Sequence, residues 1–195
     1  MTIVVAHRGA STFAPENTME AYRLAVEQGA DAIEVDVHLT ADGQLAVIHD
    51  ETLERTTDGS GAVAALTMEQ IRAVDAGATF AGSDGSFPHR GRGLRVPTLP
   101  EVIEWLPAEI GLVIEIKARA AVDEVVRLMG RPDETRLRAS VLSFDEQSIQ
   151  RSRELDPELP TGLLLVPSDS FERGLVWVTE HGHGAVHPWD GDLGV

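Results

Sequence analysis

Short apolar runs rich in β-branched residues alternate with helical patterns, and this alternation restricts most strongly how the chain can fold. The predicted strands are Ile3–Ala6, Ala32–Val37, Leu45–Ile48, Leu112–Ile116, Ala139–Ser143, Thr161–Val166 and Ala185–His187. Strands separated by helices pair in parallel, because each helical crossover returns the chain to the same end of the sheet. The pattern predicts an α/β protein, with a (β/α) barrel as the preferred architecture and an open doubly wound sheet as the alternative.

Several predicted helices begin at residues that favour helix N-termini. The pairs Asn17 and Glu20, Thr67 and Gln70, and Thr98 and Glu101 have the spacing of a capping box, and Gly29 ends the first helix. Further helices are predicted at Ala121–Met129, Glu146–Leu155 and Phe171–His181. A glycine- and serine-rich stretch from Asp75 to Arg95 interrupts the alternation. We therefore expect a single domain, residues 1–195, with an insertion at about residues 51–96.

Charge and composition exclude several classes of function. The formal net charge of −16 argues against binding to nucleic acid or to an anionic membrane, because both require a basic face. The apolar runs are far shorter than the roughly 18–20 residues of a membrane helix, so we expect no stable membrane insertion. The absence of cysteine excludes disulfides and thiolate metal sites, and it fits a cytoplasmic protein.

Charged side chains interrupt the apolar strands at regular positions. In the second predicted strand, a period of two places Glu34, Asp36 and His38 on one face and apolar residues on the other. Glu115 and Lys117 repeat this arrangement in a later strand. Parallel strands are normally apolar on both faces, and a buried carboxylate costs several kcal/mol unless it is paired or bound to a cation. These residues therefore predict a site inside the barrel, and the period of two makes His38 face that site.

Other polar residues follow predicted strands at the end where barrels build their active sites. His7 and Arg8 come after the first strand, and His49 and Asp50 follow the Leu45–Ile48 run. Two histidines can provide an acid and a base near neutral pH, and Arg8 adds local positive charge for an anionic substrate.

Two interpretations of the three inward carboxylates stay open from the residues alone. Three carboxylates suit a hard divalent cation such as Mg²⁺ or Ca²⁺, which prefers oxygen ligands. The alternative is a set of structural ion pairs, for instance Glu115 with Lys117 or Arg8 with Glu34.

The same residues belong to a series of short motifs. In order, these are His7-Arg8-Gly9-Ala10, Ala14-Pro15-Glu16-Asn17-Thr18, Glu34-Val35-Asp36-Val37, Asp42-Gly43, His49-Asp50, Thr52-Leu53-Glu54-Arg55-Thr56-Thr57, Pro97-Thr98-Leu99 and Ile114-Glu115-Ile116-Lys117. The order and spacing of these motifs resemble the glycerophosphodiester phosphodiesterase family, and the resemblance covers roughly the first three-quarters of the chain.

The resemblance implies a TIM barrel that cleaves small-molecule glycerophosphodiesters to glycerol 3-phosphate and an alcohol. It implies Glu34, Asp36 and Glu115 as the ligands of one divalent cation, Mg²⁺ or Ca²⁺. It further implies His7 and His49 as general acid and base, with Arg8 and Lys117 as phosphate contacts. The insertion is expected to lie over the substrate mouth. Because family members carry varied polar residues at the position of His38, we expect this histidine to line the pocket rather than bind the metal.

The sequence also departs from the family pattern. Six strand units are counted, near residues 4, 34, 114, 141, 163 and 186, with the Leu45–Ile48 run as an accessory strand of the second unit. Family members continue with two more units, so we expect a truncated barrel with two open sheet edges. A gene fragment, an engineered piece and a shortened protein that forms a homo-oligomer to cover those edges stay open as explanations.

Two other functions compete with the first. One is a lysophospholipase D-like enzyme of the same fold, which would differ in the loops at the substrate mouth. The other is a catalytically silent truncated remnant that folds only with a partner or not at all.

Overall fold

One sheet contains all the strands of the computed structural model, which describes residues 2–130, 138–166 and 169–188. The strands are β1 (Val5–Ala6), β2 (Ala32–Leu39), β3 (Leu45–Val47), β4 (Gly111–Ile116), β5 (Ala139–Ser143), β6 (Thr161–Leu165) and β7 (Ala185–Pro188). Their order is β1-β2-β4-β5-β6-β7, with every pair parallel, and β3 joins β2 antiparallel.

The strand order identifies the architecture. Successive parallel strands are neighbours, and the order never reverses, whereas a doubly wound sheet requires a reversal at its switch point. The predicted barrel type with six strand units is therefore confirmed, as is the role of β3 as an accessory strand of β2. The first strand is shorter than predicted, because the amide of Val4 donates to Asp31 Oδ2 at 2.8 Å instead of to a neighbouring strand.

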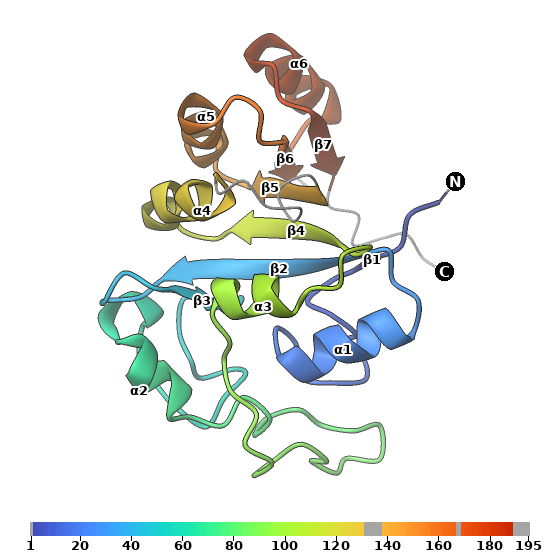
Figure 1. Ribbon diagram of the computed structural model, residues 1–195, viewed down its shortest axis with the longest axis vertical. Helices are drawn as coiled ribbons and strands as arrows, with labels where there is room; N and C mark the ends of the chain where they lie inside the picture. The colour runs from blue at the N-terminus through green and yellow to red at the C-terminus, as the bar shows by residue number, and fades with distance from the viewer. Residues whose placement is uncertain (1, 131–137, 167–168, 189–195) are drawn as a thin grey trace.

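The helices other than α2 lie around the outside of the curved sheet, from α1 beside β1 and β2 to α6 beside β6 and β7 (Figure 1). The helices of the chain are α1 (Met19–Glu27), α2 (Met68–Arg72), α3 (Leu99–Trp105), α4 (Val122–Met129), α5 (Glu146–Leu155) and α6 (Phe171–His181), with 3₁₀ turns η1 (Val63–Ala65) and η2 (Arg119–Ala121). None of the helices formed by the described residues has the length and apolar character needed to cross a membrane.

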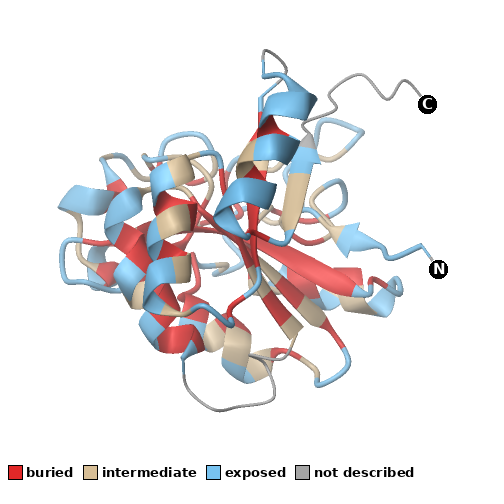
Figure 2. Cartoon of the chain, turned by 90° about the horizontal axis from the view of Figure 1, so that it is seen from above, coloured by how far each residue is buried: buried red, intermediate tan, exposed pale blue. Residues whose placement is uncertain are grey.

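The main core lies between the sheet and these helices, and Figure 2 shows buried residues concentrated along the strands. Ile33, Val35 and Val37 of β2 are fully buried on the side opposite the acidic residues. They belong to one cluster with Tyr22 of α1 and Val125 of α4. Each such side chain contributes about 1.5–3 kcal/mol of burial free energy, so the apolar face of β2 anchors the strand that carries the acidic face.

The predicted helix starts are partly correct. Thr67 with Gln70 and Thr98 with Glu101 form complete capping boxes. The prediction that Asn17 caps α1 is wrong, because Thr18 Oγ1 accepts the amide hydrogen of Ala21.

Asn17 has a different role from a helix cap. Its backbone is left-handed, with φ 54°. Its side chain donates to Asp36 Oδ2 at 2.8 Å and accepts from the hydroxyl of Tyr22 at 2.8 Å. The helix starts one residue later than predicted because the site engages the amide of Asn17.

The segment between β3 and α3 packs around a second apolar cluster. This cluster consists of Ala46, Ile48, Leu53, Val63, Met68, Ile71, Ala76 and Val96. In Figure 1 the segment forms the lower part of the molecule, where α2 lies near the tip of β2 and a long loop runs below α3 and α1. The segment thus has its own small core, which is continuous with β3 through Ala46.

Gly9 tests how tightly the turn after β1 is packed. Its φ is +80°, and a Cβ at this position would lie 2.7 Å from the carbonyl carbon of Ala21. We expect Gly9→Ala to lower the free energy of unfolding by about 2–5 kcal/mol, combining the left-handed penalty with overpacking. Gly43→Ala is the matched control, because Gly43 has a similar φ of +75° but no atom within 4 Å of its Cβ position. Urea denaturation of both variants makes the comparison, and equal losses would contradict the packing explanation.

Candidate active site and metal centre

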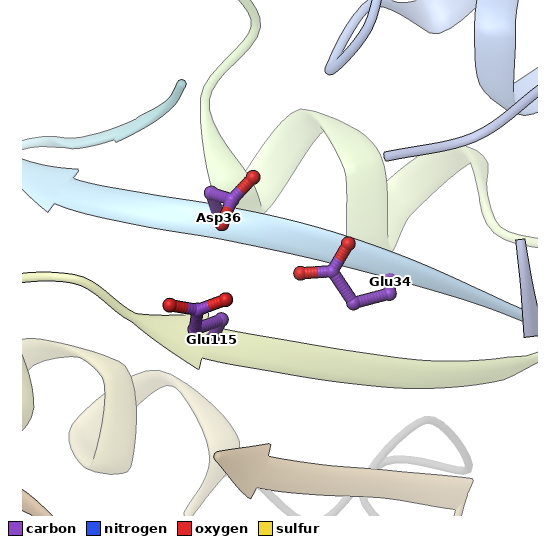
Figure 3. A group of neighbouring side chains, drawn as sticks. All are labelled: Glu34, Asp36 and Glu115. Atoms are coloured by element: carbon purple, nitrogen blue, oxygen red, sulfur yellow. The ribbon is translucent and has the colours of Figure 1, made fainter. Parts of the chain in front are cut away.

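Three carboxylates from two adjacent strands meet on the inner face of the sheet. Glu34 and Asp36 come from β2 and Glu115 from β4, and the strand register pairs Asp36 with Glu115. One oxygen from each carboxylate lies within 4.8 Å of the others, and all three residues are buried. Figure 3 shows the three side chains turned toward a common space between the strands.

Two oxygens of this cluster are buried without a hydrogen-bond partner among the described residues, Glu34 Oε1 and Asp36 Oδ1. The second oxygen of Glu34 accepts the backbone amide hydrogen of Arg8 at 2.9 Å. Lys117 Nζ donates to Glu115 Oε1 at 2.6 Å and lies 3.6 Å from Asp36 Oδ1. Buried carboxylate oxygens left without a donor are the ligand type that a hard divalent cation prefers. The residues present therefore fit such a cation.

The expected structural ion pairs are only partly present. Lys117 pairs with Glu115, as the structural alternative predicted. The guanidinium of Arg8 instead lies 3.1 Å from Asp36 Oδ2 and 3.2 Å from Glu16 Oε1, so the pairing of the Arg8 and Glu34 side chains is wrong. Arg8 and Lys117 thus pair with Asp36 and Glu115, and among the described residues no side-chain cation forms an ion pair with Glu34.

Burial changes the protonation of the acids. Desolvation and then the negative charge of Asp36 raise the pKa of Glu34 to about 8. Desolvation also raises the pKa of Glu115, against the lowering effect of Lys117. Carboxylates this close together cannot all ionise easily without a compensating positive charge. The cluster therefore carries a proton near neutral pH that a bound cation would displace.

The turn after β1 supplies several of these contacts through unusual backbone geometry. Arg8 has φ 57°, a left-handed conformation that L residues rarely adopt, and Gly9 follows with φ +80°. This conformation directs the amide of Arg8 toward Glu34 while its side chain reaches Asp36. Backbone strain of this kind, about 1–3 kcal/mol per residue, is concentrated at functional sites.

The two predicted catalytic histidines lie at the same end of the sheet. Desolvation and the positive charge of Arg8 lower the pKa of His7, and the negative charge of Asp36 offsets part of this lowering. His49 follows β3, and its Nδ1 lies 2.6 Å from Asp50 Oδ1. The structure thus brings together all seven residues predicted for the site, each within contact or electrostatic reach of another member.

His38 lies next to the site but outside the cluster of three carboxylates. Its Nε2 lies 3.0 Å from the backbone carbonyl oxygen of His49. Burial lowers the pKa of His38, so the ring is neutral near pH 7 and donates from Nε2 to this carbonyl. The role of His38 as a residue that lines the pocket stays a prediction.

Sequence reasoning assigned no site role to Glu16 or Arg55, and for Asp50 it noted only the place beside His49. Arg55 donates to both oxygens of Asp50 and to both oxygens of Glu16 at 2.7–2.9 Å. The signal was present, because Asp50 directly follows His49 and Arg55 lies five residues later. Strand periodicity could not detect these residues, since they lie in loops.

A pocket lies beside this network, between the turn after β1 and the segment that follows β3. Its lining includes Ser11, Glu16, Arg55, Thr56, Thr79 and Phe80. Residues from different parts of the chain therefore form a hollow beside Glu16 and Arg55.

Comparison with known proteins identifies relatives across nearly all of the chain. The model of the glycerophosphoryl diester phosphodiesterase family matches residues 7–188. A glycerophosphodiester phosphodiesterase of Caldanaerobacter subterraneus subsp. tengcongensis is 41% identical over 168 residues, which are 84% of this chain and 66% of that protein. One from Bacillus subtilis is 36% identical over 177 residues, covering 84% of this chain and 59% of that protein. The chain spans less than two thirds of the length of these relatives.

Solved structures give the same result for the fold. A glycerophosphodiester phosphodiesterase from Agrobacterium tumefaciens matches with a TM-score of 0.72 and 33% identity, over 99% of this chain and 89% of that chain. A phosphodiesterase of Oleispira antarctica, solved in complex with the product sn-glycerol-3-phosphate, matches with a TM-score of 0.82 and 28% identity. That match covers 96% of this chain and 75% of the other.

The raised pKa of Glu34 makes the stability of the metal-free protein depend on pH. The unfolded chain loses the Glu34 proton near the ordinary glutamate pKa, whereas the folded protein keeps it up to about pH 8. The contribution of Glu34 to the free energy of unfolding is therefore fully present below about pH 4.5, and it is lost as pH rises through 8. Glu34→Gln should remove this fall, so its advantage over the wild type grows between pH 5 and 8.5.

Urea unfolding in chelator at several pH values measures the difference between the two proteins. Glu27→Gln, at an exposed position of α1, controls for the loss of one negative charge. Parallel stability curves for the wild type and Glu34→Gln would contradict the raised pKa.

Proposed function

The chain belongs to the glycerophosphoryl diester phosphodiesterase family, and on that basis we propose that it hydrolyses glycerophosphodiesters to glycerol 3-phosphate and an alcohol. We propose Glu34, Asp36 and Glu115 as the ligands of one divalent cation, Mg²⁺ or Ca²⁺. The observation that carries the proposal is the cluster of three buried carboxylates, two of which have an oxygen without a partner among the described residues. A cation held there would act as a Lewis acid toward the phosphodiester and help to orient it.

The two histidines are suited to opposite proton transfers. The lowered pKa of His7 keeps its ring neutral near pH 7, which suits a group that accepts a proton from the attacking hydroxyl or water. The carboxylate of Asp50 lies 2.6 Å from His49 Nδ1, which leaves Nε2 as the nitrogen that can donate a proton to the leaving alcohol. We therefore assign His7 as the general base and His49 as the general acid.

Arg8 and Lys117 are proposed to bind the phosphoryl oxygens. Both side chains reach the edge of the carboxylate cluster, and each is about four-fifths buried, with exposures of 18% and 16%. In such a site a guanidinium and an ammonium stabilise the charge that develops on the phosphoryl group more strongly than they would in water. These two cations also solve the electrostatic problem that a net charge of −16 poses for an anionic substrate.

The segment at about residues 51–96 is proposed to be an insertion that covers the substrate mouth of a single domain. Support comes from the pocket that Arg55, Thr56, Thr79 and Phe80 share with Glu16 of the turn before α1. The bound product in the Oleispira antarctica relative supports glycerol 3-phosphate as the product here. The cytoplasmic location and the homo-oligomer stay predictions of the sequence.

Turnover of glycerophosphocholine tests the proposed function. The purified 195-residue chain should release glycerol 3-phosphate with Mg²⁺ or Ca²⁺, and chelator should stop the reaction. Asp36→Asn should abolish turnover, and His7→Gln or His49→Gln should lower kcat by about 10²–10⁴-fold. Asp123→Asn, on the exposed side of α4, is the control for a loss of carboxylate charge.

Thermal unfolding must show that each variant is folded before its rate is compared. Full activity in chelator would contradict the metal assignment. A folded wild-type chain without turnover under any metal would contradict the activity of this chain and favour the silent remnant.

A further inference from the structure

His49 is held from two sides. Its ring Nδ1 lies 2.6 Å from Asp50 Oδ1, and its backbone carbonyl oxygen lies 3.0 Å from His38 Nε2. A carboxylate only accepts hydrogen bonds, so the proton of the neutral His49 ring lies on Nδ1. Nε2 is then the ring nitrogen left for proton exchange with a substrate.

Asp50 is itself fixed by a bidentate contact with Arg55. Arg55 Nε donates to Asp50 Oδ2 at 2.7 Å, and Arg55 Nη2 donates to Asp50 Oδ1 at 2.9 Å. These hydrogen bonds hold the pKa of Asp50 well below its usual range. The planar fork of the guanidinium binds the carboxylate through two hydrogen bonds and so fixes its orientation as well as pairing its charge. An ammonium group pairs the charge but does not fix the orientation in this way.

The other edge of the same guanidinium engages Glu16. Arg55 Nη1 donates to Glu16 Oε2 at 2.9 Å and Nη2 donates to Glu16 Oε1 at 2.7 Å. Arg8 Nη1 donates to Glu16 Oε1 at 3.2 Å, and Arg8 Nε lies 3.1 Å from Asp36 Oδ2. Groups of alternating charge therefore connect the ring of His49 to the carboxylate cluster.

We propose that Asp50 and Arg55 are positioning residues: Arg55 clamps Asp50, and Asp50 holds His49 in the orientation and tautomer that present Nε2 to the substrate. Through Glu16, the same arginine also fixes Arg8 relative to His49. The inference deepens the proposed hydrolysis and rests on it for its catalytic consequence. Asp50 keeps its charge throughout, while the proton that His49 exchanges enters and leaves at Nε2.

An ordinary surface ion pair would be the simpler explanation, because the Arg55 side chain is 46% exposed. Exposed pairs contribute little to stability and fix no third group. The chain contains such a pair for comparison, since Arg151 donates to both oxygens of Asp123 at 3.1 Å and both side chains are exposed. Arg55 differs because it donates to both oxygens of two carboxylates, and one of these, Asp50, contacts the ring of His49, a predicted catalytic residue.

The tautomer of His49 gives the most direct test, because it needs no turnover. In Asp50→Asn, the carbonyl oxygen of the new amide should turn to the donors of Arg55, and its NH₂ group should face His49 Nδ1. We therefore expect ¹⁵N NMR of the histidine rings to show His49 protonated on Nδ1 in the wild type and on Nε2 in Asp50→Asn. Asp123→Asn is the control and should leave the His49 signals unchanged. A ring that keeps its proton on Nδ1 in Asp50→Asn would overturn the proposal.

Kinetics test the catalytic consequence of the tautomer. Asp50→Asn should lower kcat by about 10²–10⁴-fold with little change in KM, because the wrong nitrogen faces the substrate. Arg55→Lys keeps the charge but loses the fork, and we expect a loss of about 10–100-fold in kcat. Added guanidinium should restore part of the activity of Arg55→Ala.

The arginine control is Arg151→Lys, which should leave kcat and KM unchanged. Normal kcat in a folded Arg55→Ala variant would overturn the clamp. A wild-type chain without turnover would contradict the proposed function, while the NMR result would still decide the assignment of His49.

Discussion

Three carboxylates buried within 4.8 Å of one another form the constraint on which the other polar contacts of the barrel interior depend. Mutual repulsion and the loss of water both oppose ionisation, and the pKa of Glu34 rises to about 8 as a result. Three donors around the cluster offset part of this cost: the backbone amide of Arg8, the ammonium of Lys117 and the side-chain amide of Asn17 each donate to a different carboxylate. A divalent cation would offset the rest of the free-energy cost of ionising the three carboxylates.

The fold meets this constraint by separating two tasks within one strand. The residues of β2 that face the helices are apolar and fully buried. Their burial stabilises the strand and offsets the repulsion and desolvation of the carboxylates on its other face. Strained backbone at Arg8 and Asn17 then carries the supporting donors to the acids. The strain is maintained by tight packing, since Gly9 lies against the backbone of Ala21 with no room for a Cβ. The packing of the core thus offsets the backbone strain and the repulsion between carboxylates that the site introduces.

Much of this arrangement could be predicted from the sequence because periodicity has a geometric meaning. The period of two placed Glu34 and Asp36 on one face, and the strand alternation gave the correct neighbours for β2 and β4. Loop geometry has no such period, so the left-handed turn that brings Asn17 to Asp36 looked like a helix cap. The contact of Arg55 with Glu16 depends on tertiary structure, because it joins residues 39 apart in sequence, and the local contact of Arg55 with Asp50 depends on the conformation of a loop.

Proton release on cation binding measures the central claim most directly. If burial keeps Glu34 protonated at pH 7, a cation that binds the cluster must displace this proton. Titration calorimetry with Mg²⁺ or Ca²⁺ in two buffers of different ionisation enthalpy counts the protons. The account predicts release of about one proton per cation at pH 7, and much less release with Glu34→Gln. Binding without proton release, or no binding to the folded wild-type chain, would contradict a cation site built on three buried carboxylates.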